Sequence, residues 1–219
     1  MDLRERLLER LPDGPATVQM RALLELGETQ LFGTPEGAAF AHAEAALGVL
    51  HGRPTSKTLI EFTLCCGAPP ELLALEPVEL AGYAWERLTL STGGEGRGEA
   101  SRLTPGLWPS VPPELSLTLA TAMERRAVFC AQVDGLPVSF AWAPLRSERW
   151  FDLHVETVSA FRRRGLARRA ASALLRHERN EGRAPVWVSP ASNEAAVALG
   201  RSLGFSDCGQ TLWRAHKRV

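Results

Sequence analysis

The chain has 219 residues, 45% of them hydrophobic, so it can bury a sizeable core in one large domain or two small ones. It carries 25 basic and 25 acidic residues, and this balance excludes an overall field that would draw it to nucleic acid or to an anionic membrane. No segment approaches the roughly 20 apolar residues that span a bilayer. Four cysteines are too few for a disulfide scaffold, and the adjacent Cys65 and Cys66 lack a simple metal-ligand spacing. We therefore expect a cytoplasmic protein without a metal site.

The first half of the chain has a mixed α/β pattern. Leucines at 3, 7, 8 and 11 lie on one face of a short helix that ends at the proline and glycine cluster 12–15, and a second helix is expected over 18–26. Further along we expect strands at 38–41 and 59–64 and helical or irregular segments over 71–87. Ser91–Gly98, STGGEGRG, indicates a flexible connection rather than a phosphate loop, because no apolar strand leads straight into its glycines and no clear helix follows.

The pattern becomes sharper after Pro112 and Pro113. A helix is expected over 114–123, and two strands, 127–133 and 137–142, are joined by a hairpin turn at Asp134 and Gly135. The remaining expected elements, in chain order, are a strand at 150–158, a helix that starts near Leu166 and ends at Gly182, a strand at 185–189, a helix ending at Leu203 and a strand at 210–214.

The strand at 150–158, WFDLHVETV, alternates in character. Asp152, His154 and Glu156 point to one side, while the residues between them point to the other. Three polar groups on one face of a strand indicate water or a cleft on that side.

The segment that follows, ETVSAFRRRGLARR, leads from this strand through a glycine into a helix. The first N–H groups of a helix have no partner within the helix, so they can bind an anion, and the positive end of the helix dipole helps. Gly165 and Ala167 are small enough for a phosphate to approach the backbone. The segment therefore predicts an anion site made by backbone N–H groups, and this prediction does not depend on the arginine side chains.

These residues resemble the GNAT acyltransferase superfamily. The pyrophosphate motif of that family, Gln or Arg-x-x-Gly-x-Gly or Ala, is matched by Arg162–Ala167, and its later Asn-x-x-Ala and Leu-Gly-Phe are matched by Asn193–Ala196 and Leu203–Phe205. The resemblance covers roughly residues 113–219. It implies an α/β fold with a mixed, centrally splayed sheet flanked by helices, in a catalytic domain over 111–219. Residues 1–110 would then form an N-terminal α/β region, either a substrate-specificity domain or a degenerate copy of the same fold.

The resemblance also implies acetyl-CoA as co-substrate and a primary amine as acceptor. The expected cofactor-binding residues are those of the motif, the main chain just before it and one asparagine: Thr157, Val158, Arg162, Arg163, Arg164, Gly165, Leu166, Ala167, Arg168 and Asn193. The backbone at 157 and 158 would pair with the pantetheine arm, and the cofactor would lie where the strands at 152–158 and 185–189 splay apart.

Acyl transfer requires that the amine lose a proton, that the oxyanion find donors and that the departing thiolate be protonated. Glu156 is the candidate base, directly or through water, and His154 is second; both also fit a solvated strand face without catalytic duty. The oxyanion donor is expected near Val158. Many members of the family carry a tyrosine as the thiolate's acid at the position of Gly200, whereas the one tyrosine here is Tyr83. A different group or water would protonate the thiolate, or catalysis is lost.

Two functions therefore stay open. The first is an N-acetyltransferase that acts on a small amine or a peptide and works as a monomer or homodimer. The second is a non-catalytic acyl-CoA-binding module whose N-terminal half binds a partner. Binding of nucleic acid through Arg162–Arg164 is disfavoured, because the net charge is zero and no aromatic platform is interleaved with the arginines.

Overall fold

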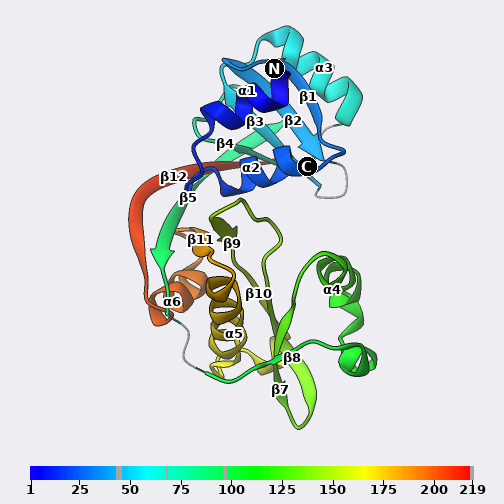
Figure 1. Ribbon diagram of the computed structural model, residues 1–219, viewed down its shortest axis with the longest axis vertical. Coiled ribbons are helices and arrows are strands. Elements are labelled where there is room, and N and C mark those ends of the chain that lie inside the picture. Colours follow the sequence, from blue (N-terminus) through cyan, green and yellow to red (C-terminus); the bar gives the residue numbers. More distant parts are fainter. Residues whose placement is uncertain (43–45, 68, 96–97, 218–219) are drawn as a thin grey trace.

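A computed structural model of the chain describes residues 1–219 except 43–45, 68, 96–97 and 218–219, and it omits the side chain of Arg125. The molecule is mixed α/β, with an N-terminal half in the upper part of Figure 1 and a C-terminal half in the lower part. The N-terminus and the end of the last strand, at Lys217, both lie in the upper part (Figure 1).

Eight strands form the larger sheet, and they come from both halves of the chain. Their order is β1-β2-β3-β4-β12-β5-β11-β9. Their bounds are Gln30–Thr34 (β1), Gly37–His42 (β2), Leu47–Gly52 (β3), Glu71–Ala74 (β4), Tyr83–Gly93 (β5), Trp150–Asp152 (β9), Ala184–Pro190 (β11) and Phe205–Lys217 (β12). The two longest, β5 and β12, run antiparallel from the lower to the upper part of the molecule and bind the halves together (Figure 1).

Four strands form the smaller sheet, in the order β10-β8-β7-β6, and all their pairings are antiparallel. They are Ser101–Arg102 (β6), Phe129–Val133 (β7), Leu136–Trp142 (β8) and His154–Thr157 (β10). The strand expected over 150–158 is therefore two strands, β9 in one sheet and β10 in the other, with the break at Leu153.

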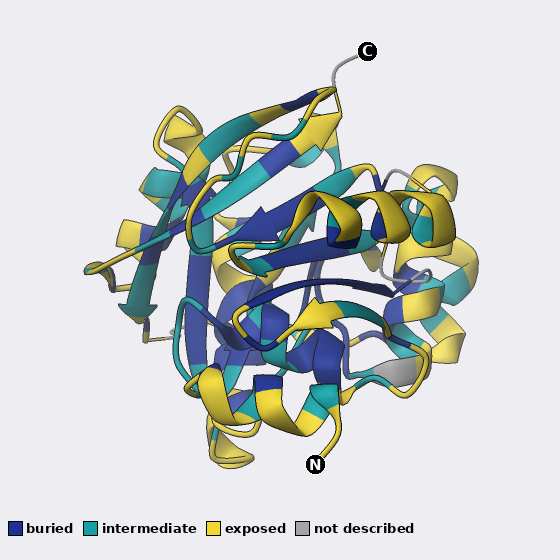
Figure 2. Cartoon of the chain, turned by 90° about the horizontal axis from the view of Figure 1, so that it is seen from above, coloured by how far each residue is buried: buried dark blue, intermediate teal, exposed yellow. Residues whose placement is uncertain are grey.

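Helices cover both faces of the strands. Those of the N-terminal half are Leu3–Arg10 (α1), Val18–Glu25 (α2) and Ser56–Cys66 (α3); those of the C-terminal half are Pro113–Arg125 (α4), Leu166–Asn180 (α5) and Glu194–Ser202 (α6), with 3₁₀ turns at Pro105–Ser110 (η2) and Ser159–Phe161 (η3). Helices α1 and α2 pack on the face that carries Val186, while α5 packs on the opposite face, against Trp187. Helix α4 covers the other side of the smaller sheet, over Phe140 and Trp142. Figure 2 shows the result: buried strands in the middle and helices whose outer faces are exposed.

Most expected elements are confirmed, but β1 and β3 were not expected and the strand at 150–158 is divided. The other errors lie between residues 59 and 93. The run at 59–64 is helical, because Thr55 caps α3 by accepting a hydrogen bond from the Thr58 N–H at 3.2 Å, and the helix buries Phe62 while Leu64 stays exposed. Segment 71–87 contains the strands β4 and the start of β5. Strand β5 also continues through Gly93, so the first part of the expected connection is hydrogen-bonded in the sheet. Residues 96–97 of that connection lie outside the described residues.

The two halves share a topology. Strands β1, β2 and β3 are antiparallel neighbours, and α3 then crosses to β4, which is parallel to β3. In the second half β7, β8 and β10 are antiparallel neighbours, and α5 crosses to β11, which is parallel to β9. The final strands are exchanged, since β5 pairs with β11 and β12 pairs with β4. The strands are thus pseudosymmetric about the pair β5 and β12 only when both sheets are taken together, because the counterparts of β1 and β2 are β7 and β8 of the smaller sheet.

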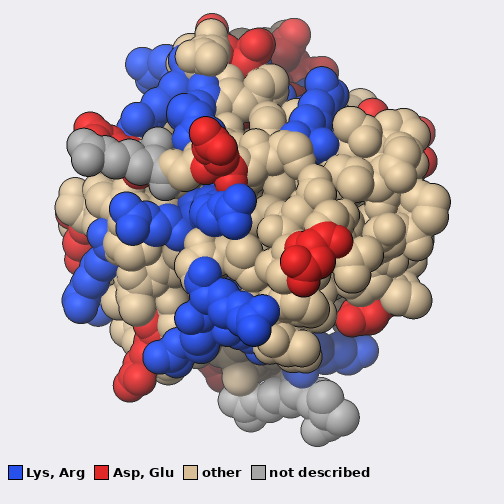
Figure 3. Space-filling view, turned by 90° about the horizontal axis from the view of Figure 1, so that it is seen from below, with Lys and Arg blue, Asp and Glu red and all other residues tan. Residues whose placement is uncertain are grey.

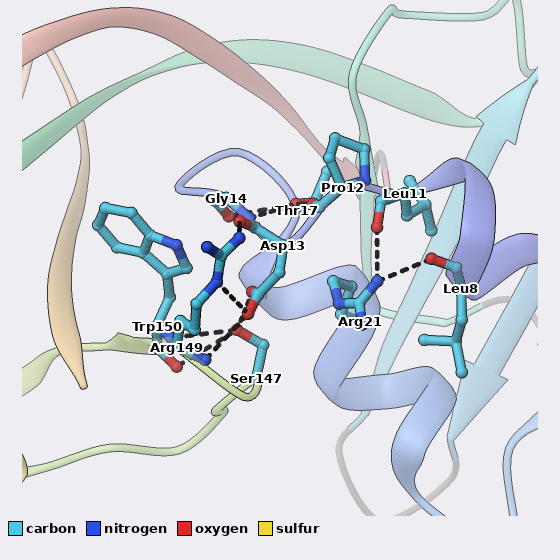
Figure 4. A network of polar contacts seen from close by, with 10 residues as sticks. All are labelled: Leu8, Leu11, Pro12, Asp13, Gly14, Thr17, Arg21, Ser147, Arg149 and Trp150. Carbon is cyan, nitrogen blue, oxygen red and sulfur yellow. Dashed lines mark hydrogen bonds and ion pairs between the residues drawn. The ribbon is translucent and has the colours of Figure 1, made fainter. Parts of the chain in front are cut away.

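A buried carboxylate ties the halves together beside this sheet (Figure 4). Asp13, in the loop between α1 and α2, accepts hydrogen bonds from the Ser147 hydroxyl and from the Arg149 backbone N–H at 2.9 Å. The Asp13 side chain is only 7% exposed. Because charged hydrogen bonds to a buried carboxylate restrain both partners, this contact fixes the loop that leads into β9.

Candidate functional site

The site begins where one strand changes its partner. Strand β9 pairs in parallel with β11 as far as Asp152 opposite Val186, and the Leu153 N–H still donates to the Val186 carbonyl at 3.1 Å. Beyond that point β10 pairs with β8 alone. The two parallel strands therefore splay, with a gap between β10 and β11.

Backbone groups of β10 face this gap. The Val158 N–H donates to the Val138 carbonyl at 2.9 Å, so the N–H groups of the even-numbered residues of β10 point toward β8. The Leu153 N–H points the other way, toward β11. Because N–H groups alternate along a strand, those of Val155 and Thr157 point into the gap, where they have no acceptor among the described residues. Unpaired backbone donors in a half-buried strand are costly unless a ligand or water meets them.

This finding alters one expectation. Both backbone groups of Val158 are already used, since its carbonyl also accepts from the Phe161 N–H at 2.9 Å. Val158 therefore does not offer its N–H to an oxyanion or to a pantetheine arm. Thr157 is better placed through its N–H, although its carbonyl accepts from Arg162 Nε at 3.1 Å.

The turn after β10 leads to an uncapped helix. Arg163 and Gly165 have left-handed backbone angles, φ +64° and +73°, and no side chain caps the N-terminus of α5 at Gly165. The N–H groups of residues 163–168 have no acceptor among the described residues. A Cβ built at Gly165 would meet no atom within 4 Å, so the approach to these donors is open. The buried side chain of Leu166 and the amphipathic pattern after it hold the helix against the sheet.

Exposed arginines surround this turn. Arg162, Arg163, Arg164, Arg168 and Arg169 are all exposed. Their positions are only partly held: Arg164 lies over the Phe161 ring, at 5.5 Å from its centre, and Arg169 Nε donates to the Glu99 carbonyl at 2.9 Å. Basic side chains gather on this underside of the molecule (Figure 3). Open backbone donors and exposed cations together suit a ligand with several phosphates.

Glu156 and His154 lie together on the face of β10 that is turned away from α5. Glu156 is 36% exposed and forms an ion pair with Arg162 at 3.4 Å. The His154 ring packs on the Trp142 ring at 4.4 Å between centres. His154 and Glu156 therefore share one face of β10 as expected, whereas the third expected residue, Asp152, lies in β9.

Asp152 belongs to the contact between β9 and α2. Its carboxylate accepts a hydrogen bond from Gln19 Nε2 at 2.7 Å. Burial raises the pKa of this carboxyl group, although the bond from Gln19 and the nearby His154 act in the opposite direction. Asp152 therefore positions the strand and does not face the gap.

Asn193 begins α6 as expected for the later motif. Its Oδ1 accepts a hydrogen bond from the Ala196 N–H at 3.1 Å and caps the helix. The side-chain amide group has no acceptor among the described residues and is exposed, so it can donate to a ligand.

Gly200 leaves room for a tryptophan. A Cβ built at Gly200 would lie 3.0 Å from Cδ1 and from Nε1 of Trp187, which comes from β11 at the first position of the splay. The Trp187 indole is buried, and its N–H has no acceptor among the described residues. Sequence reasoning left this partner unidentified, because the contact joins two elements across the fold. Tyr83 does not take the place of the missing tyrosine, because its hydroxyl donates to the Pro69 carbonyl at 2.7 Å in the N-terminal half.

The described residues contain no helix long and apolar enough to cross a membrane. They also contain no group of three or more histidine, cysteine, aspartate or glutamate side chains that could hold a metal ion. Of the four cysteines only Cys130 is buried, and all four are free thiols.

Comparison with known proteins agrees with this geometry. Residues 127–211 match the family model described as GNAT acetyltransferase. The fold resembles a GCN5-related N-acetyltransferase-like protein from Streptococcus suis at TM-score 0.72, with 17% identity over 99% of this chain and 100% of that one. It also resembles a putative GNAT acetyltransferase from Novosphingobium aromaticivorans at TM-score 0.64, with 19% identity over 85% of this chain and 91% of that one. Curated protein sequences gave no match.

The packing of Gly200 can be tested by its replacement with alanine. Alanine favours a helix by about 1 kcal/mol over glycine, but the added methyl group meets the indole, and overpacking costs about 1–3 kcal/mol. We expect Gly200→Ala to lower the free energy of unfolding in urea by about 1 kcal/mol. In a Trp187→Leu background the same change should stabilise. A stabilising effect in the wild-type background would show that the indole does not fill this space.

Proposed function

We propose that the protein is an N-acetyltransferase, and the premise is that its residues 127–211 match the family model described as GNAT acetyltransferase. It would transfer an acetyl group from acetyl-CoA to a primary amine of a small molecule or a peptide, by direct attack within a ternary complex. The observation that carries the proposal is the row of unpaired N–H groups at 155, 157 and 163–168, which begins in the splay and ends at the open N-terminus of α5.

Coenzyme A fits the donors of this row. Its pyrophosphate would lie against the N–H groups of residues 163–168, where the helix dipole and the arginines favour negative charge. Its pantetheine amides would pair with the strand-edge groups of Val155 and Thr157 and with the exposed amide of Asn193. When bound, acetyl-CoA would supply the activated acyl group as its thioester.

Glu156 is proposed to take the proton from the acceptor amine, directly or through a water molecule, with His154 as the second candidate. Both lie on β10 beside residues whose N–H groups face the gap. An N–H of Thr157 or Val155, in place of that of Val158, is proposed to stabilise the oxyanion. The Arg162 contact holds the Glu156 side chain near the turn.

The second candidate function, an acyl-CoA-binding module without catalysis, is favoured by one observation. The space at Gly200 is filled by an indole whose N–H is not an acid, and the chain's one tyrosine is engaged in the N-terminal half. In the enzyme, water would have to protonate the departing thiolate.

Residues 1–110 are proposed to be a degenerate copy of the same fold that shapes the acceptor side. The shared order of strands and crossover helices supports this, and so does the capped start of α3, where Thr55 already satisfies an N–H that the second half leaves open. We propose that this copy has lost its own anion site.

Replacement of Gly165 tests the phosphate site. Glu at 165 would place a carboxylate against the donors, and we expect acetyl-CoA affinity to fall by about 100-fold through like-charge repulsion and lost donors. Gly209→Glu is the matched control, because Gly209 has φ +72° and equally open space but lies in β12. Both variants should lose about 1–3 kcal/mol of stability through backbone strain. Equal loss of affinity in the two variants would contradict the site.

Replacement of Glu156 tests the base. With a panel of amines and with free thiol release as the readout, we expect Glu156→Gln to lower kcat by about 100-fold and to remove the decline of the rate in acid. Arg162→Gln is the control: it breaks the same ion pair but keeps the carboxylate, so the acid decline should persist.

An unchanged pH–rate profile in Glu156→Gln would remove Glu156 as the base and direct the same test to His154. Tight binding of acetyl-CoA without turnover across a broad panel would favour the binding module instead.

A further inference from the structure

A pocket lies at the far end of α5, between the two halves of the chain. Its volume is about 440 Å³, and its lining residues come from the end of α2, the residue after α4, the loop before β9 and the loop before β11: Glu25, Arg126, Arg146, Ser147, Glu148 and Arg183. The 15-residue helix α5 separates this pocket from the proposed phosphate site by about 20 Å.

The base of the pocket is a buried group of charges. Glu178 on α5 has no exposed side-chain surface, and its carboxylate pairs with Arg146 and, at 3.5 Å, with Arg183. The two arginine side chains are 15% and 25% exposed. Two guanidinium groups thus share one carboxylate in a place that is largely shielded from water.

These guanidinium groups retain unused donors. Arg146 Nε and Arg183 Nε are shielded from solvent and have no hydrogen-bond acceptor among the described residues. Arg183 Nη1 faces Glu178 Oε2 at 3.5 Å and makes an ion pair there without a hydrogen bond. Burial lowers the pKa of the Arg146 guanidinium, Glu178 acts in the opposite direction, and the positive charges of Arg126 and Arg183 add to the lowering. A buried excess of positive charge with unused donors is costly without a further anion.

The rim of the pocket has the opposite charge. Glu25 and Glu148 are exposed, and neither forms an ion pair with a described residue. Both line the same pocket. Burial raises the pKa of Glu25, Arg21 acts against this, and repulsion from Asp13 and Glu148 adds to the rise. A cation at the rim would relieve that repulsion.

From this arrangement we propose that the pocket binds a free amino acid, with its carboxylate at Arg146 and Arg183 and its ammonium group at Glu25 and Glu148. A planar fork of guanidinium donors suits a carboxylate, and the two charges of the ligand then match the two ends of the pocket. The site is separate from the proposed acetyl-CoA site and does not depend on it.

The test is a calorimetric titration of the intact protein with each of the twenty amino acids at millimolar concentration. We expect at least one to bind with 1:1 stoichiometry. The deaminated acid and the decarboxylated amine of that amino acid should each bind at least about tenfold more weakly, because each lacks one of the two charge contacts. Binding of the acid alone with equal affinity, or no binding by any of the twenty, would overturn the proposal.

Matched variants locate the ligand. Glu25→Gln should remove the preference for the amino acid over its deaminated form, and Arg183→Lys, which keeps the charge beside Glu178 but loses the fork, should weaken both about tenfold. Glu28→Gln and Arg53→Gln, at exposed positions outside the pocket, are the controls. Gly165→Glu should leave amino acid binding unchanged, so a failure of the acetyl-CoA site cannot be mistaken for a failure of this one. Loss of binding in the controls or in Gly165→Glu would contradict the assignment.

Discussion

The candidate site depends on the segment 150–157, which pairs with β11 in its first part and with β8 in its second part, but with both nowhere. In the first half of the chain, residues 47–50 of β3 are hydrogen-bonded to β2 on one side and to β4 on the other. In the second half these two pairings belong to two separate strands, since β9 pairs with β11 and β10 pairs with β8. The division at Leu153 opens the gap and exposes the N–H groups of Val155 and Thr157. A continuous strand would have used those donors in the sheet.

Two further features matter because of this gap. The turn after β10 uses the left-handed conformations of Arg163 and Gly165 to direct the first N–H groups of α5 outward. The side of β10 away from α5 carries Glu156 and His154, the two residues proposed as the base. Strands β5 and β12 and the buried Asp13 hold the surrounding sheet in place. A hydrogen-bonded frame around an open strand edge suits a preorganised binding site.

The parts of the site that depend on local chemistry could be predicted from the sequence. Gly165 and the amphipathic spacing after it define the turn and the helix, and Asn193 caps α6 where the motif placed it. The break at Leu153 could not be predicted, because it depends on which neighbouring strand forms hydrogen bonds at each residue. The contact of Trp187 with Gly200 was missed for a similar reason, since nothing local to either residue indicates the other. The run at 59–64 misled because its apolar residues fit a strand as well as a helix, and the cap at Thr55 decided the outcome.

Amide hydrogen exchange with and without coenzyme A tests the central claim most directly, because it reads each backbone donor separately. The account predicts that coenzyme A slows exchange at Thr157 and at residues 163–168, while Val158, which already donates to Val138, is unchanged. Protection confined to other parts of the chain, or no protection at Thr157 and 163–168 when coenzyme A is bound, would contradict the claim that the splay and the start of α5 form the binding site.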